Sequence, residues 1–266
     1  MTLSRSATQD ARTGTATWLA WGFGATAVGC QMVFPFTDGG TSALTVLTVV
    51  LFAAATLSCA WAARGAWGAV LLLAVAGGGG WLAEAVGVHT SVPFGEYSYA
   101  GTLGWQVFDV PVVVPLAWVM LTYPALLVGR RLASDRWARI LVGAWALASW
   151  DVFLDPQMVD AGHWTWAHPT PSLPGVSGIP LTNFAGWLLV ALLLIAALDL
   201  ALPHAAQVLP EDRVPGALYL WTYVSSVLAH ALFFGRPPVA LVGGIVMGLV
   251  AVPYAVAWYR AVRPSR

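Results

Sequence analysis

Long apolar segments alternate with short polar connections along almost the whole chain. A membrane-spanning helix needs about 20 mainly apolar residues. Eight segments approach that length, although Gly or Pro interrupts several of them: 18–36, 41–63, 66–88, 107–129, 137–159, 180–202, 215–234 and 238–260. The pattern predicts an all-α, polytopic membrane helix bundle with about eight transmembrane helices, and a count of seven is also compatible with it.

The arginines test this count independently, because loops on the cytoplasmic side of a membrane carry an excess of Lys and Arg. With eight spans and both termini in the cytoplasm, the cytoplasmic segments hold Arg5, Arg12, Arg64, Arg130, Arg131, Arg136, Arg139, Arg213, Arg260, Arg263 and Arg266. Only Arg236 falls on the outer side. We therefore predict a single transmembrane helical domain over 18–260, between cytoplasmic tails at 1–17 and 261–266.

The composition agrees with a multi-pass protein of the cell membrane. Of the 266 residues, 59% are hydrophobic and 9% are charged, and the mean hydropathy is +0.75. Soluble domains carry about a quarter charged residues. The formal net charge is zero and there is no basic run, so nucleic-acid binding is not expected.

One apolar segment contains two acids four residues apart, in the sequence WDVFLDP. Asp151 and Asp155 share one helix face, and Pro156 predicts a kink or a frayed helix end at Asp155. In the predicted topology four other polar side chains lie at the same outer level, namely Glu84, Asp109, Asn183 and His230. Charged groups inside spans usually face a wet cavity and mark function. The alternative is that some of them lie at the membrane interface, where their cost is small.

Aromatic residues surround this level. A pair of close carboxylates in a low-dielectric site holds one proton between them, so Asp151 and Asp155 are candidates for a general acid. Six tryptophans lie in nearby spans or loops: Trp105, Trp118, Trp150, Trp164, Trp166 and Trp187. An interfacial belt also attracts Trp, but a pocket walled by indoles suits a long conjugated chain and stabilises a transient cation. His89, His163 and His168 match no metal-ligand spacing, so no metal is expected.

Three membrane classes can be excluded or weakened. Retinal proteins have a similar number of spans, but a retinal Schiff base needs a lysine and this chain has none. Membrane prenyltransferases use two Asp-rich motifs with cationic side chains, whereas here one motif faces outward with only Arg236 nearby. Transporters pair matching interrupted helices in two halves, and no such pair is evident.

Three stretches occur together in a familiar order and spacing: GVHTSVPFGEYSYAGTLGWQVFDVPVVVPLAWVMLTYP, WDVFLDPQMVDAGHWTW and GIPLTNFAGWLL. They resemble the CruF-type carotenoid hydratases, a membrane family that includes the bisanhydrobacterioruberin hydratases. The resemblance covers roughly residues 80 to 200, with weaker agreement to about 255. It implies a hydro-lyase that adds water across the terminal 1,2 double bond of an acyclic ψ-end carotenoid. It also implies a lipid-soluble carotenoid substrate, no cofactor, and other carotenoid-pathway enzymes as candidate partners.

The resemblance also implies where the site lies. Its polar positions fall at Glu96, Asp151, Asp155 and Asn183, and its aromatic positions at Trp164, Trp166 and Trp187. We predict that Asp155 or Asp151 donates a proton, that Asn183 or Glu96 positions the water, and that Trp164 and Trp166 shield the cation. The predicted substrate-binding residues are Glu84, Trp105, Trp150, Trp164, Trp166, Trp187 and His230. The family pattern has glycine where this chain has Ser91 and Asp109.

Two other functions stay open. Protonation followed by internal alkene capture would make the protein an end-group cyclase, and a protein with the same pocket could bind or transport carotenoids without reaction. Product mass separates these functions, because hydration adds a water and cyclisation adds nothing.

Overall fold

The computed structural model describes residues 3–37, 41–203 and 212–262. Its long elements are helices, in the order α1 (Leu3–Val33), α2 (Ser42–Leu72), α3 (Gly79–Thr90), α4 (Val114–Leu132), α5 (Arg136–Ala148), α6 (Asp151–Asp160), α7 (Leu181–Ala201), α8 (Arg213–Leu232) and α9 (Pro237–Val262). Two short helices, η1 (Phe34–Phe36) and η2 (Leu73–Gly78), adjoin α1 and α2. The predicted all-α membrane helix bundle is confirmed.

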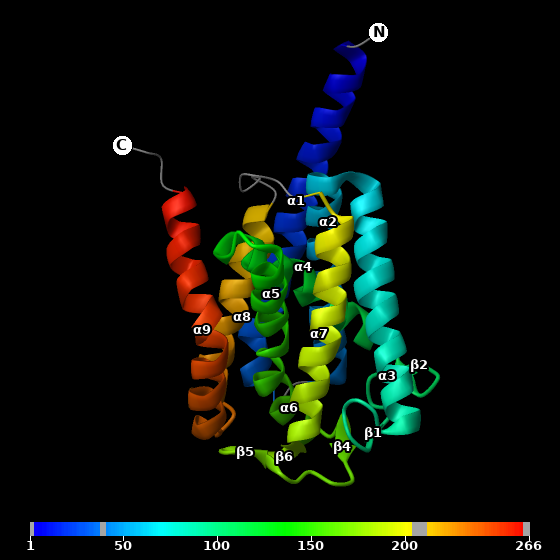
Figure 1. The fold of residues 1–266 in the computed structure, drawn as a ribbon, viewed down its shortest axis with the longest axis vertical. Helices are drawn as coiled ribbons and strands as arrows, with labels where there is room; N and C mark the ends of the chain where they lie inside the picture. The colour runs from blue at the N-terminus through cyan, green and yellow to red at the C-terminus, as the bar shows by residue number, and fades with distance from the viewer. Residues whose placement is uncertain (1–2, 38–40, 204–211, 263–266) are drawn as a thin grey trace.

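Short antiparallel strands close one end of the bundle. They are β1 (Tyr97–Tyr99), β2 (Gln106–Val107), β3 (Val110–Pro111), β4 (Trp164–Trp166), β5 (Ser172–Leu173) and β6 (Val176–Pro180). β1 pairs with β4, β2 with β3, and β5 with β6. Figure 1 shows these strands at the end opposite both termini, and we call this end the hairpin end.

Helix α4 lies in the middle of the bundle. It contacts α2, α5, α7, α8 and α9, and all its residues from Trp118 to Gly129 are buried. A helix that is apolar on all sides belongs inside a bundle rather than on its surface. Helices α2, α5, α7, α8 and α9 therefore pack around α4.

Within the described ranges, five helical segments are long and apolar enough to cross a membrane: Gly14–Phe36, Ser42–Thr90, Arg136–Asp160, Leu181–Ala201 and Pro237–Ala261. The longest is not one rod, because Gly65 is non-helical, with φ 73°. Only glycine adopts that conformation readily. After this kink the chain turns back and runs down to α3 (Figure 1). The segment thus supplies two of the predicted spans, while the total of eight spans and the cytoplasmic side stay predictions.

The predicted tails fall partly outside the described residues. Helix α1 begins at Leu3, inside the predicted tail 1–17, and residues 1–2 and 263–266 lie outside the described ranges. Figure 1 shows the first turns of α1 and the last turns of α9 at the same end of the bundle. That arrangement agrees with an even number of crossings, and the boundaries at 17 and 260 stay predictions.

The sequence predicted a kink or a frayed helix end at Asp155, before Pro156, but the break in the helix lies elsewhere. Pro156 is inside α6, and the helix breaks earlier, at Ser149 and Trp150 between α5 and α6. There the backbone tightens, since the amide of Trp150 donates to Leu147 O and that of Phe153 donates to Trp150 O, three residues back in each case. The break gives α6 a start of its own, and Asp151 is its first residue.

Two positions where the family pattern has glycine adopt a backbone that favours glycine. Ser91 has φ 65° and Asp109 has φ 59°, and non-glycine residues rarely occupy this region. Ser91 ends α3 with a left-handed cap. Ser91 and Asp109 therefore adopt the backbone conformation that a glycine would adopt at these positions, although the residue types differ.

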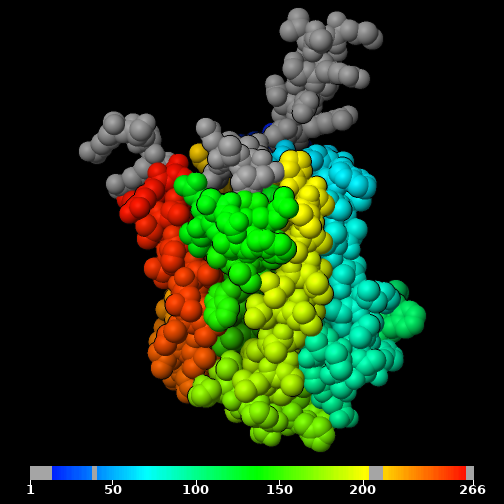
Figure 2. Space-filling model, in the orientation of Figure 1, coloured from blue at the N-terminus to red at the C-terminus, as the bar shows by residue number. Residues whose placement is uncertain are grey.

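The two long loops of the hairpin end pack against each other. The pairing of β1 with β4 joins residues 97–99 to residues 164–166. In Figure 2 the loop that carries β4, β5 and β6 covers the lower end of the bundle. These loops are packed caps on the end of the bundle.

Close packing explains one glycine in the run Gly77 to Gly80. A Cβ atom added at Gly80 would lie 2.4 Å from Cγ of Trp118, whereas one added at Gly78 meets nothing within 4 Å. Trp118 is buried and stacks on Trp187, with ring centroids 4.1 Å apart. Gly80 thus allows α3 to approach the central helix.

Substitution of Gly80 by Ala is expected to destabilise the bundle, because the new methyl group must displace the Trp118 ring. Overpacking of this kind costs about 1–3 kcal/mol. Thermal unfolding of the detergent-solubilised protein measures the change, and Gly78→Ala is the matched control within the same glycine run. Equal unfolding temperatures for the two variants would contradict the packing role.

The predicted orientation can be tested with a pair of single cysteines in a variant lacking Cys30 and Cys59. Ala167 is exposed at the hairpin end and Ser134 is exposed at the opposite end, between α4 and α5. A membrane-impermeant maleimide added to intact cells should label Ala167→Cys and leave Ser134→Cys unlabelled until the cells are opened. The reverse labelling would show that the bundle has the opposite orientation.

Candidate functional site

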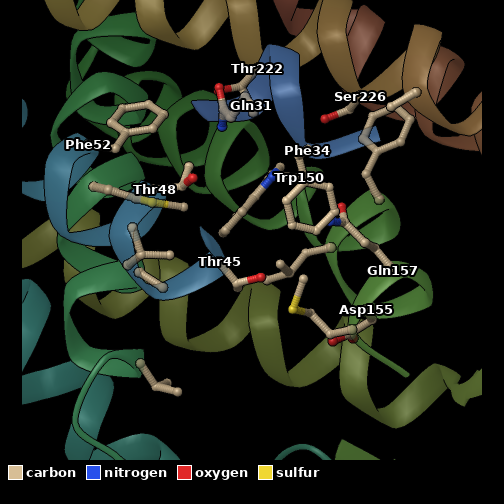
Figure 3. A pocket seen from close by; sticks show the side chains of 18 of the residues that line it. Gln31, Phe34, Thr45, Thr48, Phe52, Trp150, Asp155, Gln157, Thr222 and Ser226 are labelled. Atoms are coloured by element: carbon tan, nitrogen blue, oxygen red, sulfur yellow. The ribbon is translucent and has the colours of Figure 1, made fainter. Parts of the chain in front are cut away.

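A cavity of about 390 Å³ lies inside the bundle, towards the hairpin end. Its lining comes from α1, η1, α2, α3, α4, α6, α7 and α8, together with β1 and β4. Figure 3 shows part of this lining, with Thr45, Thr48 and Phe52 from α2 facing Trp150 and Asp155 across the cavity. The volume is that of a small-molecule site.

Two buried carboxylates share one amide beside this cavity. Nδ2 of Asn183 donates to Oδ2 of Asp151 at 2.7 Å and to Oδ2 of Asp155 at 2.5 Å. Nε1 of Trp164 donates to Oδ1 of Asp155 at 3.0 Å. Asp151, Asp155 and Asn183 are each at most 2% exposed. Sequence reasoning predicted that these acids share a helix face, and the structure brings Asn183 and Trp164 to them.

The two acids have different positions relative to the cavity. Asp155 lines the cavity, whereas Asp151 is fully buried behind it, and Oδ1 of Asp151 has no hydrogen-bond partner among the described residues. Two buried carboxylates with one amide between them cannot both carry charge at low cost. The pair is suited to holding one proton, and Asp155 is the member that can deliver it into the cavity.

Glu84 is a third buried carboxylate that lines the same cavity. Its Oε2 accepts from the hydroxyl of Tyr97 at 2.5 Å and from that of Tyr99 at 2.9 Å. Its Oε1 accepts from Nε1 of Trp118 at 3.1 Å. Burial, and after it the charge of Glu84, raise the pKa of both tyrosines above the usual range, so both phenols remain donors.

Tyr97 and Tyr99 are site residues that the sequence analysis missed. They lie in the stretch Glu96-Tyr97-Ser98-Tyr99, and alternate residues of a strand point to opposite faces. Tyr97 and Tyr99 line the cavity, while Ser98 is exposed. The alternation of aromatic and polar residues in this stretch is the signal that could have identified them.

The predicted tryptophans form much of the wall. Trp150, Trp164, Trp166 and Trp187 all line the cavity, as does Trp118. Trp118 stacks on Trp187, and Trp166 stacks on Tyr97 with ring centroids 5.8 Å apart. Stacked aromatic faces stabilise a passing positive charge and exclude bulk water.

The structure does not bring Glu96, Trp105 or His230 into the lining. The Glu96 side chain is 61% exposed, and its Oε2 lies 3.5 Å from Nε2 of His168. Glu96 directly precedes β1, and its side chain lies on the opposite side of the chain from that of Tyr97. Trp105 is 88% exposed. His230 is buried behind the wall, where Nε2 lies 3.1 Å from the carbonyl of Phe153.

The remaining acids of the hairpin end lie outside the cavity. Asp109 is exposed and lies 3.3 Å from Nε2 of His89, and Asp160 pairs with Arg236. Among the described residues, no group of three or more His, Cys, Asp or Glu side chains is placed to hold a metal ion. The predicted absence of a metal from the reaction stays a prediction.

Buried acids and an aromatic wall thus enclose one cavity inside a helix bundle of the membrane type. The family of carotenoid biosynthesis proteins matches residues 44–251, and the chain belongs to that family. The family membership predicted from the three sequence stretches is confirmed, which supports a role in carotenoid biosynthesis.

One curated relative is the bisanhydrobacterioruberin hydratase of Haloarcula japonica, which is 34% identical over 128 residues. The matched region makes up 46% of this chain and 42% of that protein, so the chain spans less than half of the relative's length. No solved structure matches the chain.

The cap over the site should weaken in acid because of His163. This residue is buried, and its Nδ1 lies 2.7 Å from Oγ1 of Thr102 in the other long loop. Burial lowers the pKa of His163 below its usual value of 6.5. Stability from the neutral ring is therefore present above about pH 6.5 and is lost as the pH falls through the lower folded-state pKa.

We expect the unfolding temperature to fall between pH 7.5 and pH 5, and the fall to be smaller in His163→Gln. His168→Gln is the control, since His168 lies in the same loop and its side chain is 82% exposed. An identical pH dependence in the wild type and both variants would contradict the role of His163.

Proposed function

We propose that the protein is a carotenoid hydratase of the cell membrane, which adds water across the terminal 1,2 double bond of an acyclic ψ-end carotenoid. The observation that carries the proposal is the buried acid pair, with Asp155 at the surface of an aromatic-walled cavity. The family and the name of the Haloarcula japonica relative support a substrate of the bacterioruberin type.

The reaction begins with proton transfer. Asp155 gives its proton to the less substituted alkene carbon, which forms a C–H bond and leaves a tertiary carbocation at the neighbouring carbon. Asp151 and Asn183 are positioning residues, because they hold the donor through the shared amide. A buried, positioned acid of this kind contributes about 10²–10⁴-fold to a rate.

Water then captures the cation. The new C–O bond and the loss of one water proton give a tertiary alcohol, so the sum of the steps is alkene plus water. Trp164 lies beside Asp155, and the stacked Trp118 and Trp187 face the same cavity. Their rings stabilise the cation and keep other water away from it.

The cavity holds one end of the substrate. Its lining continues from the acids to Met32 near the end of α1, to Phe36 in η1 and to Phe233 after α8, which are 58%, 74% and 48% exposed. These apolar side chains lie where the cavity meets the surface of the bundle. The rest of the polyene extends through this opening into the surrounding lipid.

Substitution of Asp155 by Asn should abolish hydration, because an amide cannot supply the proton. We expect a loss of about 100-fold or more, and Asp151→Asn should also lose activity, since it leaves Asp155 without the carboxylate that shares its proton. The assay is expression in a host that makes acyclic carotenoids, followed by mass analysis of the pigments.

Asp160→Asn is the control in the same helix, because Asp160 is exposed and pairs with Arg236. It should hydrate at the wild-type level. Wild-type-level hydration by Asp151→Asn and Asp155→Asn would overturn the acid assignment. A wild-type product with the mass of the substrate would indicate a cyclase, and unchanged bound pigment would indicate carotenoid binding without reaction.

A further inference from the structure

The cavity contains two kinds of carboxylate site. Asp151 and Asp155 share a single amide donor, and one oxygen of Asp151 has no partner among the described residues. Glu84, in contrast, accepts hydrogen bonds from three separate donors, two phenols and one indole. The first arrangement offers few donors to two acids, whereas the second surrounds one carboxyl group with donors.

The donors around Glu84 come from two different parts of the fold. Tyr97 and Tyr99 belong to β1, and Trp118 belongs to the central helix α4. Hydrogen bonds to an ionised acceptor are about twice as strong as those between neutral groups. Each carboxylate oxygen has two acceptor sites, and among the described residues Oε1 accepts one bond, from Trp118. Glu84 therefore keeps an acceptor site for a water proton.

A continuous set of contacts places Glu84 near the acid. Trp164 donates to Asp155, and the ring of Trp164 packs against Tyr99 with centroids 5.7 Å apart. Tyr99 in turn donates to Glu84. Glu84 and Asp155 both line the cavity, so both carboxyl groups are accessible from the space that a substrate end group would occupy.

We propose that Glu84 is a second catalytic residue, which provides the counter-charge for the carbocation and takes the proton released when water captures it. The inference rests on the proposed function and adds the base that the hydration step needs. Two carboxyl groups with separated roles, one protonated and one ionised, form a recurrent arrangement for acid–base chemistry.

The steps balance without another reactant. The alkene π bond breaks and the Asp155 proton becomes part of a new C–H bond, which leaves a carbocation and the Asp155 carboxylate. The oxygen of water forms the C–O bond, one O–H bond breaks, and its proton goes to Glu84. Between turnovers Glu84 loses this proton and Asp155 regains one, so the net change is alkene plus water to alcohol.

The test separates cation formation from cation capture. Membranes with the wild type or a variant are incubated with an acyclic carotenoid in deuterated water. The alcohol measures completed hydration. Recovered alkene that carries deuterium or a shifted double bond measures cations that formed and lost a proton without capture. The ratio of these two products reports on capture alone.

Glu84→Gln should reduce hydration by about 100-fold or more and should raise the ratio of exchanged alkene to alcohol by about tenfold or more. Asp155→Asn should lose both products, because no cation forms. Asp160→Asn, the matched acid-to-amide control outside the cavity, should leave both at the wild-type level. A Glu84→Gln variant that hydrates normally, or loses hydration at an unchanged ratio, would overturn the inference.

Glu84→Asp covers the case in which Glu84→Gln does not fold. This variant keeps a carboxylate but withdraws it by one methylene group from the cavity. Glu84→Asp should hydrate more slowly than the wild type and should raise the ratio of exchanged alkene to alcohol. A lower rate of hydration at an unchanged ratio would show that Glu84 only supports the fold. Failure of the wild type to form any alcohol would overturn the proposed function instead, so the two failures are distinguishable.

Discussion

Burial of three carboxylates inside an apolar bundle is the constraint on which the architecture of the site depends. A charged side chain in this setting costs several kcal/mol unless donors surround it. The donors come from separate elements: Asn183 from α7, Trp164 from β4, Tyr97 and Tyr99 from β1, and Trp118 from α4. The site exists only when these elements are assembled, so the acids also link the helices to the loops of the hairpin end.

The loops at the hairpin end are therefore part of the site rather than connections between spans. The pairing of β1 with β4 fixes two of the three donors of Glu84, Tyr97 and Tyr99, and one of the two donors of Asp155, Trp164, in one small sheet. The fold of the cap and the charge of the cavity depend on each other, because the strands bring the phenols and indoles that the carboxylates require. A change in the cap should thus affect chemistry even where it touches no substrate.

The sequence predicted the parts of the molecule that follow from local periodicity. Helix-length apolar segments are visible without tertiary information, and the spacing of Asp151 and Asp155 places them on one face of a helix in any fold. The predicted topology placed Asn183 and Trp164 at the level of the acids, and the resemblance to a known family implied the same two residues.

What the sequence analysis did not predict depends on tertiary contacts. The helix break at Ser149 and Trp150 lies away from the proline that was expected to cause it. Glu96 was predicted to position water and instead lies on the exposed face of its strand, beside Tyr97 and Tyr99, which face the cavity. Strand β1 has only three residues, so the alternation of its buried and exposed side chains becomes recognisable only when its pairing with β4 is known.

The lining of the cavity away from the acids includes polar side chains that fit the proposed hydration. Thr48 from α2 and Gln31 from α1 face the same space (Figure 3). Most helical threonines in the bundle, such as Thr122 and Thr222, donate to the carbonyl four residues earlier. The hydroxyl of Thr48 is buried without a partner among the described residues. A cyclase needs an apolar cavity that keeps water from the cation, whereas an unpaired buried hydroxyl is a place where water binds. The hydroxyl of Thr48 therefore gives the otherwise mainly apolar lining a place for water, which agrees with the proposed capture of a cation by water.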